Sequence, residues 1–259
     1  MKTTTNGLQV VGVQMDPVWE DAAASGARAA ALLDAAPPPR GSLVVLPEMF
    51  TTGFTMNTAV AEGPGGPGER WLSTMASRYG VWTMGGLARR SEEAVCANEA
   101  LVCEPSGARV AVYRKQRPFT PGGEAQYYPG GDQECLVEIA GVRVAVFLCY
   151  DLRFPELFRR AARQRPQLFV VMASWPDTRI QHWTALLRAR AIENQAYVLG
   201  VNRVGDDPTH RHNGHSLVVN PWGDVVADAG EAPGLVTANL DLVALASYRD
   251  KLPFLADLR

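Results

Sequence analysis

Short apolar runs alternate with segments of helical periodicity along the first third of the chain. The runs at residues 8–14, 43–46 and 81–87 have the length and composition of buried strands. Helical patterns at residues 19–36 and 69–79 fall between these runs. The alternation predicts an α/β protein in which helices cover a largely buried sheet.

The pattern changes between about residues 94 and 146. Consecutive strands are predicted there without helices between them, and turn signals of proline, serine and glycine stand at residues 105–107, 122–123 and 130–131. Strand and helix patterns then alternate again, at residues 142–148, 154–164, 168–172, 179–194 and 196–202. Two α/β stretches that flank a strand-rich centre predict a layered sandwich, with two packed sheets inside and helices outside.

We expect the whole chain, residues 1–259, to form one domain. Its 259 residues, of which 47% are hydrophobic, are enough to bury a sizeable core. The proline-rich segment at residues 37–39 and the glycine- and proline-rich segment at residues 63–68 are too short to be linkers between domains. We therefore interpret both segments as loops.

Charge and cysteine usage narrow the class of protein. A net charge of −2 and an isoelectric point near 6.1 give no electrostatic basis for binding nucleic acid or an anionic membrane. The expected partner is a small molecule or a second copy of the chain. The four cysteines lack C-x-x-C spacing, the N-terminus lacks an apolar signal segment, and no apolar run is long enough to cross a bilayer. We expect a soluble cytoplasmic protein with reduced thiols.

Cys149 stands where the apolar run at residues 142–148 ends and a helical pattern begins near Phe154. A thiol at a strand-to-helix corner can be partly exposed and close to the backbone N–H groups of the helix start, which favour a thiolate. This position predicts a nucleophile. The residue alone leaves a second interpretation open, in which Cys149 is an inert cysteine of the core.

Glu48 and Lys115 also follow strand-like runs, and α/β proteins assemble active sites at strand ends. Lys115 is one of three lysines among 25 basic residues, which suggests a need for a compact ammonium group. Glu48 could accept the thiol proton, Lys115 could stabilise an oxyanion, and Cys149 could attack a carbonyl carbon. Together they predict acyl transfer, whereas singly they also fit a loop acid, a surface base and a core thiol.

The segments around these residues resemble the nitrilase, or carbon–nitrogen hydrolase, superfamily over nearly the whole chain. They are Leu46-Pro47-Glu48-Met49-Phe50, Tyr113-Arg114-Lys115 and Leu148-Cys149-Tyr150-Asp151-Leu152-Arg153-Phe154-Pro155-Glu156. The resemblance implies an α/β fold of the nitrilase type, a four-layer αββα sandwich, and a homodimer. It also implies a triad of Glu48, Lys115 and Cys149, with Glu124 holding Lys115 unless Glu124 is only a turn residue. No metal or organic cofactor is implied.

Further segments are most similar to the bacterial branch of ω-amidases: residues 48–54, residues 174–176, and residues 182–183 together with residues 188–195. This similarity implies hydrolysis of the terminal amide of an ω-amido dicarboxylate, such as 2-oxoglutaramate or 2-oxosuccinamate. Arg153 would clamp the substrate carboxylate, or instead pair with Asp151 or Glu156. Arg179 is a second candidate for the clamp. Trp175 would form a pocket wall or belong to the core.

The implied mechanism begins as Glu48 takes the Cys149 proton and the sulfur attacks the amide carbon. Lys115 and the backbone N–H of Tyr150 would stabilise the oxyanion. Ammonia then leaves, and water activated by Glu48 hydrolyses the thioester.

Several alternatives stay open at this point. His210, His212 and His215 lie close together in the sequence, but their spacing matches no zinc pattern, and the glycine- and aspartate-rich surroundings are typical of a hairpin. We therefore predict no metal site. The motif around Cys149 also resembles amidases that act on deaminated glutathione, and N-carbamoyl amide hydrolases share the triad. A non-catalytic binding module with the same fold is the alternative from another class.

Overall fold

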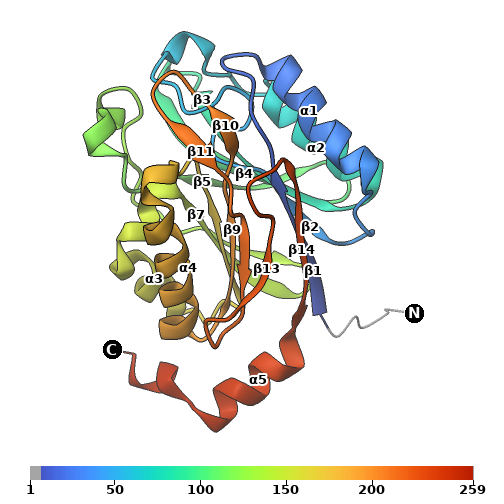
Figure 1. Cartoon of the computed structure of the whole chain (residues 1–259), viewed down its shortest axis with the longest axis vertical. Helices are drawn as coiled ribbons and strands as arrows, with labels where there is room; N and C mark the ends of the chain where they lie inside the picture. The colour runs from blue at the N-terminus through green and yellow to red at the C-terminus, as the bar shows by residue number, and fades with distance from the viewer. Residues whose placement is uncertain (1–6, 259) are drawn as a thin grey trace.

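The computed structural model describes residues 7–258, which form two six-stranded sheets packed face to face (Figure 1). The first sheet has the strand order β14-β1-β2-β3-β4-β5, with parallel pairs in the middle and antiparallel pairs towards the edges. Its strands are β1 (Gly7–Gln14), β2 (Leu43–Val45), β3 (Trp82–Arg90), β4 (Cys96–Cys103), β5 (Arg109–Arg114) and β14 (Gly234–Asp241). Strand β14 comes from the far end of the chain and pairs with β1 along its whole length.

The second sheet repeats this arrangement in the order β13-β12-β9-β8-β7-β6. Strands β7, β8 and β9 are parallel, and the outer pairs are antiparallel. The strands are β6 (Leu136–Ile139), β7 (Val142–Leu148), β8 (Leu168–Met172), β9 (Tyr197–Val201), β12 (Leu217–Val219) and β13 (Val225–Asp228). A separate hairpin pairs β10 (Val204–Asp206) with β11 (Arg211–Asn213).

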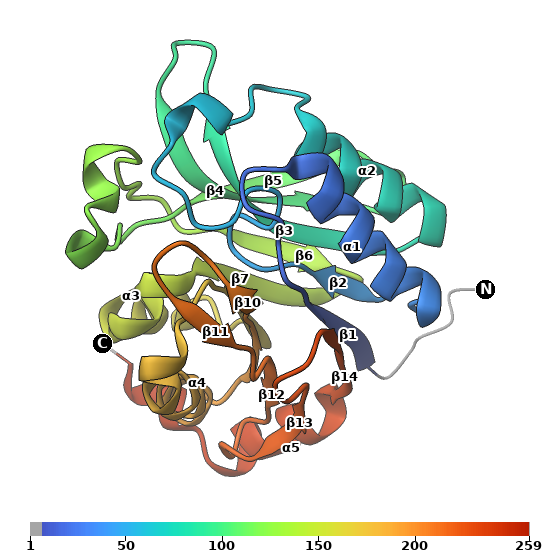
Figure 2. The same cartoon turned by 45° about the horizontal axis from the view of Figure 1, so that its top comes forward.

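Helices cover the outer face of each sheet, which completes four layers (Figure 2). Helices α1 (Ala22–Ala35) and α2 (Pro67–Tyr79) pack on the first sheet, and α3 (Pro155–Ala162) and α4 (Ile180–Asn194) lie outside the second. Helix α5 (Leu242–Lys251) follows β14 at one end of the molecule. Single 3₁₀ turns are η1 (Thr58–Val60), η2 (Thr120–Gly122), η3 (Glu124–Gln126), η4 (Cys149–Arg153), η5 (Asp177–Arg179) and η6 (Phe254–Asp257).

The alternation of side chains along a strand explains the layering. In and just after β2, Leu43 and Val45 face the core shared with the second sheet, whereas Val44 and Leu46 face the core under α1 and α2. All four side chains are fully buried. Each such burial contributes about 1.5–3 kcal/mol, so a strand that is apolar on both faces fits only between two covered layers.

The predicted αββα sandwich is confirmed, and the predicted helices and strands agree with the observed ones to within a few residues. Helix α1 begins at Ala22 rather than Trp19, because the Asp21 side chain caps it by accepting a hydrogen bond from the Ala24 backbone N–H at 2.9 Å. The central stretch contains strands as expected, together with the two 3₁₀ turns η2 and η3. Within residues 7–258, no helix has both the length and the apolar character of a membrane span.

Candidate active site

Glu48, Lys115 and Cys149 meet where the two sheets face each other. Glu48 follows β2 and Lys115 follows β5 in the first sheet, whereas Cys149 follows β7 in the second. The Cys149 thiol is within hydrogen-bond reach of the Glu48 carboxylate. The structure thus brings together three residues that are 67 and 34 positions apart in the chain.

Glu48 is held rigidly because the loop after β2 lies against β3. The Gly86 backbone N–H donates to the Pro47 carbonyl at 3.1 Å, and the Phe50 N–H donates to the Gly86 carbonyl at 3.0 Å. A Cβ atom at Gly86 would lie 2.7 Å from the Glu48 Cα, so only glycine permits this close approach. The next residue, Met49, has a left-handed φ of 46°, which turns the chain sharply after the carboxylate.

Lys115 lies between two carboxylates in a site that is closed to solvent. Its Nζ atom is 2.7 Å from Glu48 Oε1 and 2.8 Å from Glu124 Oε2, and all three side chains are buried. Burial favours the neutral amine, but Glu124 and Glu48 outweigh it and raise the pKa of Lys115 above its ordinary value. Lys115 is therefore a permanent ammonium, and Glu124 contacts it as the resemblance implied.

Asn98 in β4 is a member of this network that sequence reasoning missed. Its Nδ2 atom donates to Glu48 Oε1 and to Glu124 Oε1, each at 2.8 Å, and the side chain is buried. One amide group thus bridges the two carboxylates, and on Glu48 it shares Oε1 with Lys115. The available signal was weak: Asn98 lies between Ala97 and Glu99 in a strand that is otherwise mostly apolar. A buried amide in such a strand needs hydrogen-bond partners.

Cys149 occupies a strained corner that its neighbours hold in place. Its φ of 40° lies in the left-handed region, which costs a non-glycine residue about 1–3 kcal/mol. The buried Asp151 carboxylate offsets this cost by accepting the Leu148 N–H at 3.0 Å, the Arg117 N–H at 2.8 Å and the Tyr113 hydroxyl at 2.7 Å. The corner is therefore fixed before any substrate binds.

The expectation that the helix start favours a thiolate is wrong. Burial raises the pKa of the Cys149 thiol well above its ordinary value, and the Glu48 carboxylate raises it further. Lys115 and the Ser174 backbone N–H oppose this shift without reversing it. The resting nucleophile is a neutral thiol next to a carboxylate, so the reaction depends on proton transfer to Glu48.

A cavity opens above the thiol, and Cys149 is partly exposed in it, as expected. The volume open to the centres of water-sized molecules is about 50 Å³, which is space for only a few waters or one small ligand. Aromatic and cationic side chains dominate the walls, and the full lining is Phe54, Phe119, Cys149, Tyr150, Arg153, Ser174, Trp175, Pro176, Arg179, Asp207, His210 and His212.

Arg153 and Arg179 both line this cavity and face it from different elements, η4 and η5. The Arg153 guanidinium stacks on Trp175 at 4.8 Å and lies 3.3 Å from His182 Nδ1, so it pairs with neither of the acidic residues considered above. The Arg179 guanidinium lies 5.8 Å from the centre of the Phe119 ring. Within residues 7–258, no carboxylate forms an ion pair with either arginine.

The sequence left open whether Trp175 forms a pocket wall or belongs to the core, and in the structure it does both. It is 3% exposed and packs on Trp183, and its Nε1 atom donates to the Arg179 carbonyl at 2.8 Å. Tyr150 follows the nucleophile at the start of η4, with its ring against Phe119 and Phe154. Both residues thus shape the cavity around the thiol.

The three clustered histidines lie on the predicted hairpin and just after it. His212 bonds to Asp207 at 2.8 Å, whereas His215 lies beyond β11 and contacts Asp228 at 3.1 Å. Among the residues that the structure describes, no three histidine, cysteine, aspartate or glutamate side chains are grouped so as to hold a metal ion.

The fold and this site define a cysteine-type hydrolase of carbon–nitrogen bonds. A sequence profile of the carbon–nitrogen hydrolase family matches residues 10–250, so the chain belongs to that family and is an enzyme that acts on amides.

The chain is also similar to individual amidases and to a solved structure of the same superfamily. The chain is 38% identical to an ω-amidase of Yersinia enterocolitica over 96% of each sequence. It is 34% identical to a 2-oxoglutaramate amidase of Bacillus subtilis, over 84% of this chain and 85% of that protein. A crystal structure from Xanthomonas campestris, of a superfamily member with an arsenic adduct in its active site, shares 35% identity and a TM-score of 0.91 over 97% of both chains.

Proposed function

We propose that the protein is an ω-amidase, which hydrolyses the terminal amide of a small ω-amido dicarboxylate such as 2-oxoglutaramate or 2-oxosuccinamate. One observation carries this proposal. The cavity that contains Cys149 also contains Arg153 and Arg179, and neither guanidinium has a carboxylate partner within the described chain. Cations held against aromatic rings without a counter-ion are suited to bind an anionic ligand. An amide that carries a carboxylate at its other end offers a carbonyl carbon to Cys149 and an anionic group to the two arginines.

Proton transfer starts the proposed reaction. Glu48 accepts the Cys149 proton while the sulfur attacks the amide carbon, and a tetrahedral oxyanion forms. The Lys115 ammonium and the backbone N–H of Tyr150 stabilise that oxygen. The hydrogen bonds from Asn98 and Lys115 to Glu48 keep its carboxylate oriented towards the thiol.

Glu48 then returns its proton to the leaving nitrogen, so ammonia departs and a thioester remains on Cys149. The same carboxylate accepts a proton from water, which attacks the thioester and releases the dicarboxylate. The regenerated thiol recovers its proton from Glu48. Protein groups and water supply every step, and Glu124 keeps Lys115 charged and in place throughout.

The placement of two arginines in the same cavity as Cys149 supports a short substrate, because its amide and its carboxylate would both bind within that one cavity. The buried Glu48 and Lys115 beside the partly exposed thiol of Cys149 also argue against a non-catalytic binding module.

Ammonia release from a substrate panel tests the proposal. The panel compares 2-oxoglutaramate and 2-oxosuccinamate with glutamine, deaminated glutathione and an N-carbamoyl amino acid, with the Cys149→Ala variant as the blank. We expect strong preference for the two oxo-amides and no release by the variant. Preference for another member would reject the ω-amidase proposal, and no release from any member would favour the binding module.

We also propose that the chain forms a homodimer. Exposed apolar side chains gather over α4, the β12–β13 turn and α5, where Ile192, Trp222 and Val243 are 48%, 48% and 62% exposed. The Trp222 ring lies 4.5 Å from the Tyr248 ring, which links the turn to α5 in one surface. Light scattering should give a dimer for the wild type and a monomer for Trp222→Glu. The free thiols of all four cysteines support a cytoplasmic location.

A further inference from the structure

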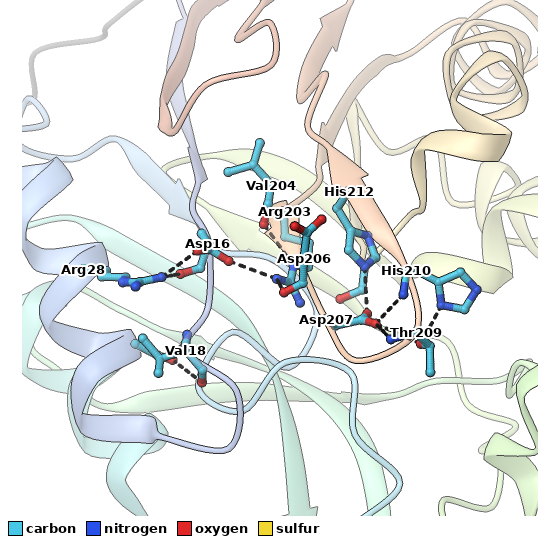
Figure 3. Close-up of polar contacts among 12 residues, drawn as sticks. Asp16, Val18, Arg28, Arg203, Val204, Asp206, Asp207, Thr209, His210 and His212 are labelled. Atoms are coloured by element: carbon cyan, nitrogen blue, oxygen red, sulfur yellow. Dashed lines mark hydrogen bonds and ion pairs between the residues drawn. The ribbon is translucent and has the colours of Figure 1, made fainter.

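The β10–β11 hairpin closes one side of the cavity, although it lies more than fifty residues after Cys149 in the chain. Asp207, His210 and His212 from this hairpin line the cavity together with Cys149. Strand β11 also contacts η5, the turn that carries Arg179. Figure 3 displays the hairpin side chains and their polar contacts. The hairpin is therefore part of the candidate substrate site. The reaction proposed above gives its side chains no role.

Asp207 determines the conformation of the hairpin tip. Its Oδ1 atom accepts the backbone N–H groups of Thr209 and His210, each at 2.7 Å, and its Oδ2 atom bonds His212 Nε2 at 2.8 Å (Figure 3). Burial alone would raise the pKa of Asp207, but the bonds from His212 and Thr209 hold it well below its ordinary value. Asp207 is thus ionised and accepts hydrogen bonds only.

The same carboxylate fixes which nitrogen of His210 carries a hydrogen. Thr209 Oγ1 lies 2.8 Å from Asp207 Oδ1 and 2.7 Å from His210 Nδ1. Because the carboxylate only accepts, the single hydroxyl hydrogen of Thr209 points to Asp207. The Thr209 oxygen must then accept a hydrogen from His210, so Nδ1 is protonated in both charge states of the ring. The Nε2 atom is left for a ligand, and it has no hydrogen-bond partner within residues 7–258.

We infer that His210 is a specificity-determining residue, whose Nε2 atom binds the carboxylate end of the substrate when the ring is protonated. The inference rests on the proposed function, because it concerns the same ω-amido dicarboxylate. The imidazole is exposed and lines the same cavity as Arg153 and Arg179. His210 would add a directional donor to the two arginines, which stack on rings.

Kinetics of His210→Gln test the inference, with His215→Gln as the matched control because His215 does not line the cavity. The substrates are 2-oxoglutaramate and the uncharged amide butyramide, both assayed at pH 6. We expect His210→Gln to raise the KM for 2-oxoglutaramate about tenfold, the effect of losing one charge-assisted hydrogen bond. The KM for butyramide should stay constant, and His215→Gln should match the wild type with both substrates.

Equal changes in KM for the two amides, or no change, would overturn the inference while leaving the proposed function standing. Failure of the wild type to hydrolyse 2-oxoglutaramate would instead overturn the proposed function, and the inference with it. Nitrogen-15 NMR supplies a second readout. At pH 8 we expect the Nδ1–H form of His210 in the wild type and a shift towards Nε2–H in Thr209→Val. Observation of Nε2–H in the wild type would reject the assignment.

Discussion

The floor and the rim of the cavity are built on opposite principles. On the floor, Glu48, Lys115, Glu124 and Asn98 are all buried and joined by hydrogen bonds of 2.7–2.8 Å. On the rim, the arginines of η4 and η5 are half-buried and rest on aromatic rings, with no counter-ion among residues 7–258. The floor is complete before substrate arrives, whereas the rim lacks the charge that a ligand would bring.

This difference assigns the reaction to the floor and the choice of substrate to the rim. Removing one partner from a buried ion network leaves an uncompensated charge, so a change in the floor should reduce both turnover and stability. A half-exposed arginine is screened by water and contributes little to folding. A change in the rim should therefore reduce affinity for the substrate with little effect on stability. Five substitutions test this division, and they follow in order of decreasing effect.

Glu48→Gln should have the largest effect, a loss of up to about 10⁴-fold in kcat/KM, because it removes the general base. It should also lower the pKa of the Cys149 thiol, since the Glu48 carboxylate helps to raise that pKa and Lys115 remains to lower it. The thiolate then appears at lower pH. Alkylation of Cys149 by iodoacetamide at pH 8, followed by mass spectrometry, should be faster in the variant, with Cys96 as the internal control. Slower alkylation would contradict the assignment.

Lys115→Ala should reduce kcat by about 10²–10³-fold, the usual cost of one oxyanion donor. It also leaves Glu48 and Glu124 buried without their shared cation, which should lower the free energy of unfolding by about 3–5 kcal/mol. Urea denaturation measures the second effect, and Lys251→Ala is the exposed control. If the variant is fully active and as stable as the wild type, Lys115 has neither the catalytic nor the stabilising role assigned to it.

Arg153→Ala and Arg179→Ala should each raise the KM for 2-oxoglutaramate by about 10–100-fold and leave kcat for butyramide nearly constant, because each removes a charge-assisted contact to the substrate carboxylate. Their free energies of unfolding should stay within about 1 kcal/mol of the wild type. Arg70→Ala, on α2, controls for loss of an exposed arginine. If one variant leaves the KM unchanged, that arginine is not part of the clamp.

Asn98→Ala should have the smallest effect, about a tenfold loss in kcat with an unchanged KM. The variant keeps every charge of the floor and removes only the donor that bridges Glu48 and Glu124. Steady-state kinetics with 2-oxoglutaramate measure the split between kcat and KM. A rise in KM alone would show that Asn98 acts on substrate affinity, as the rim residues do, and would contradict the division between floor and rim.

Much of this architecture could be predicted from local patterns. Apolar runs such as residues 142–148 are buried on both faces, so their composition alone indicated strands between covered layers. Reactive side chains directly after such runs indicated strand ends that carry chemistry. The hairpin at residues 204–213 was predicted from its glycine and aspartate content. These signals are short in range, because they depend on the periodicity of one segment at a time.

The sequence by itself determined the class of fold, the strand ends that carry Glu48, Lys115 and Cys149, and the chemistry that such groups perform. Only the tertiary structure decided the protonation state of the thiol, since burial and the proximity of a carboxylate from another sheet raise its pKa. It also decided that Asn98 bridges two carboxylates, that Arg153 pairs with neither Asp151 nor Glu156 and that His210 lines the cavity. Each of these depends on distances between segments that lie far apart in the chain, and a one-dimensional pattern does not contain those distances.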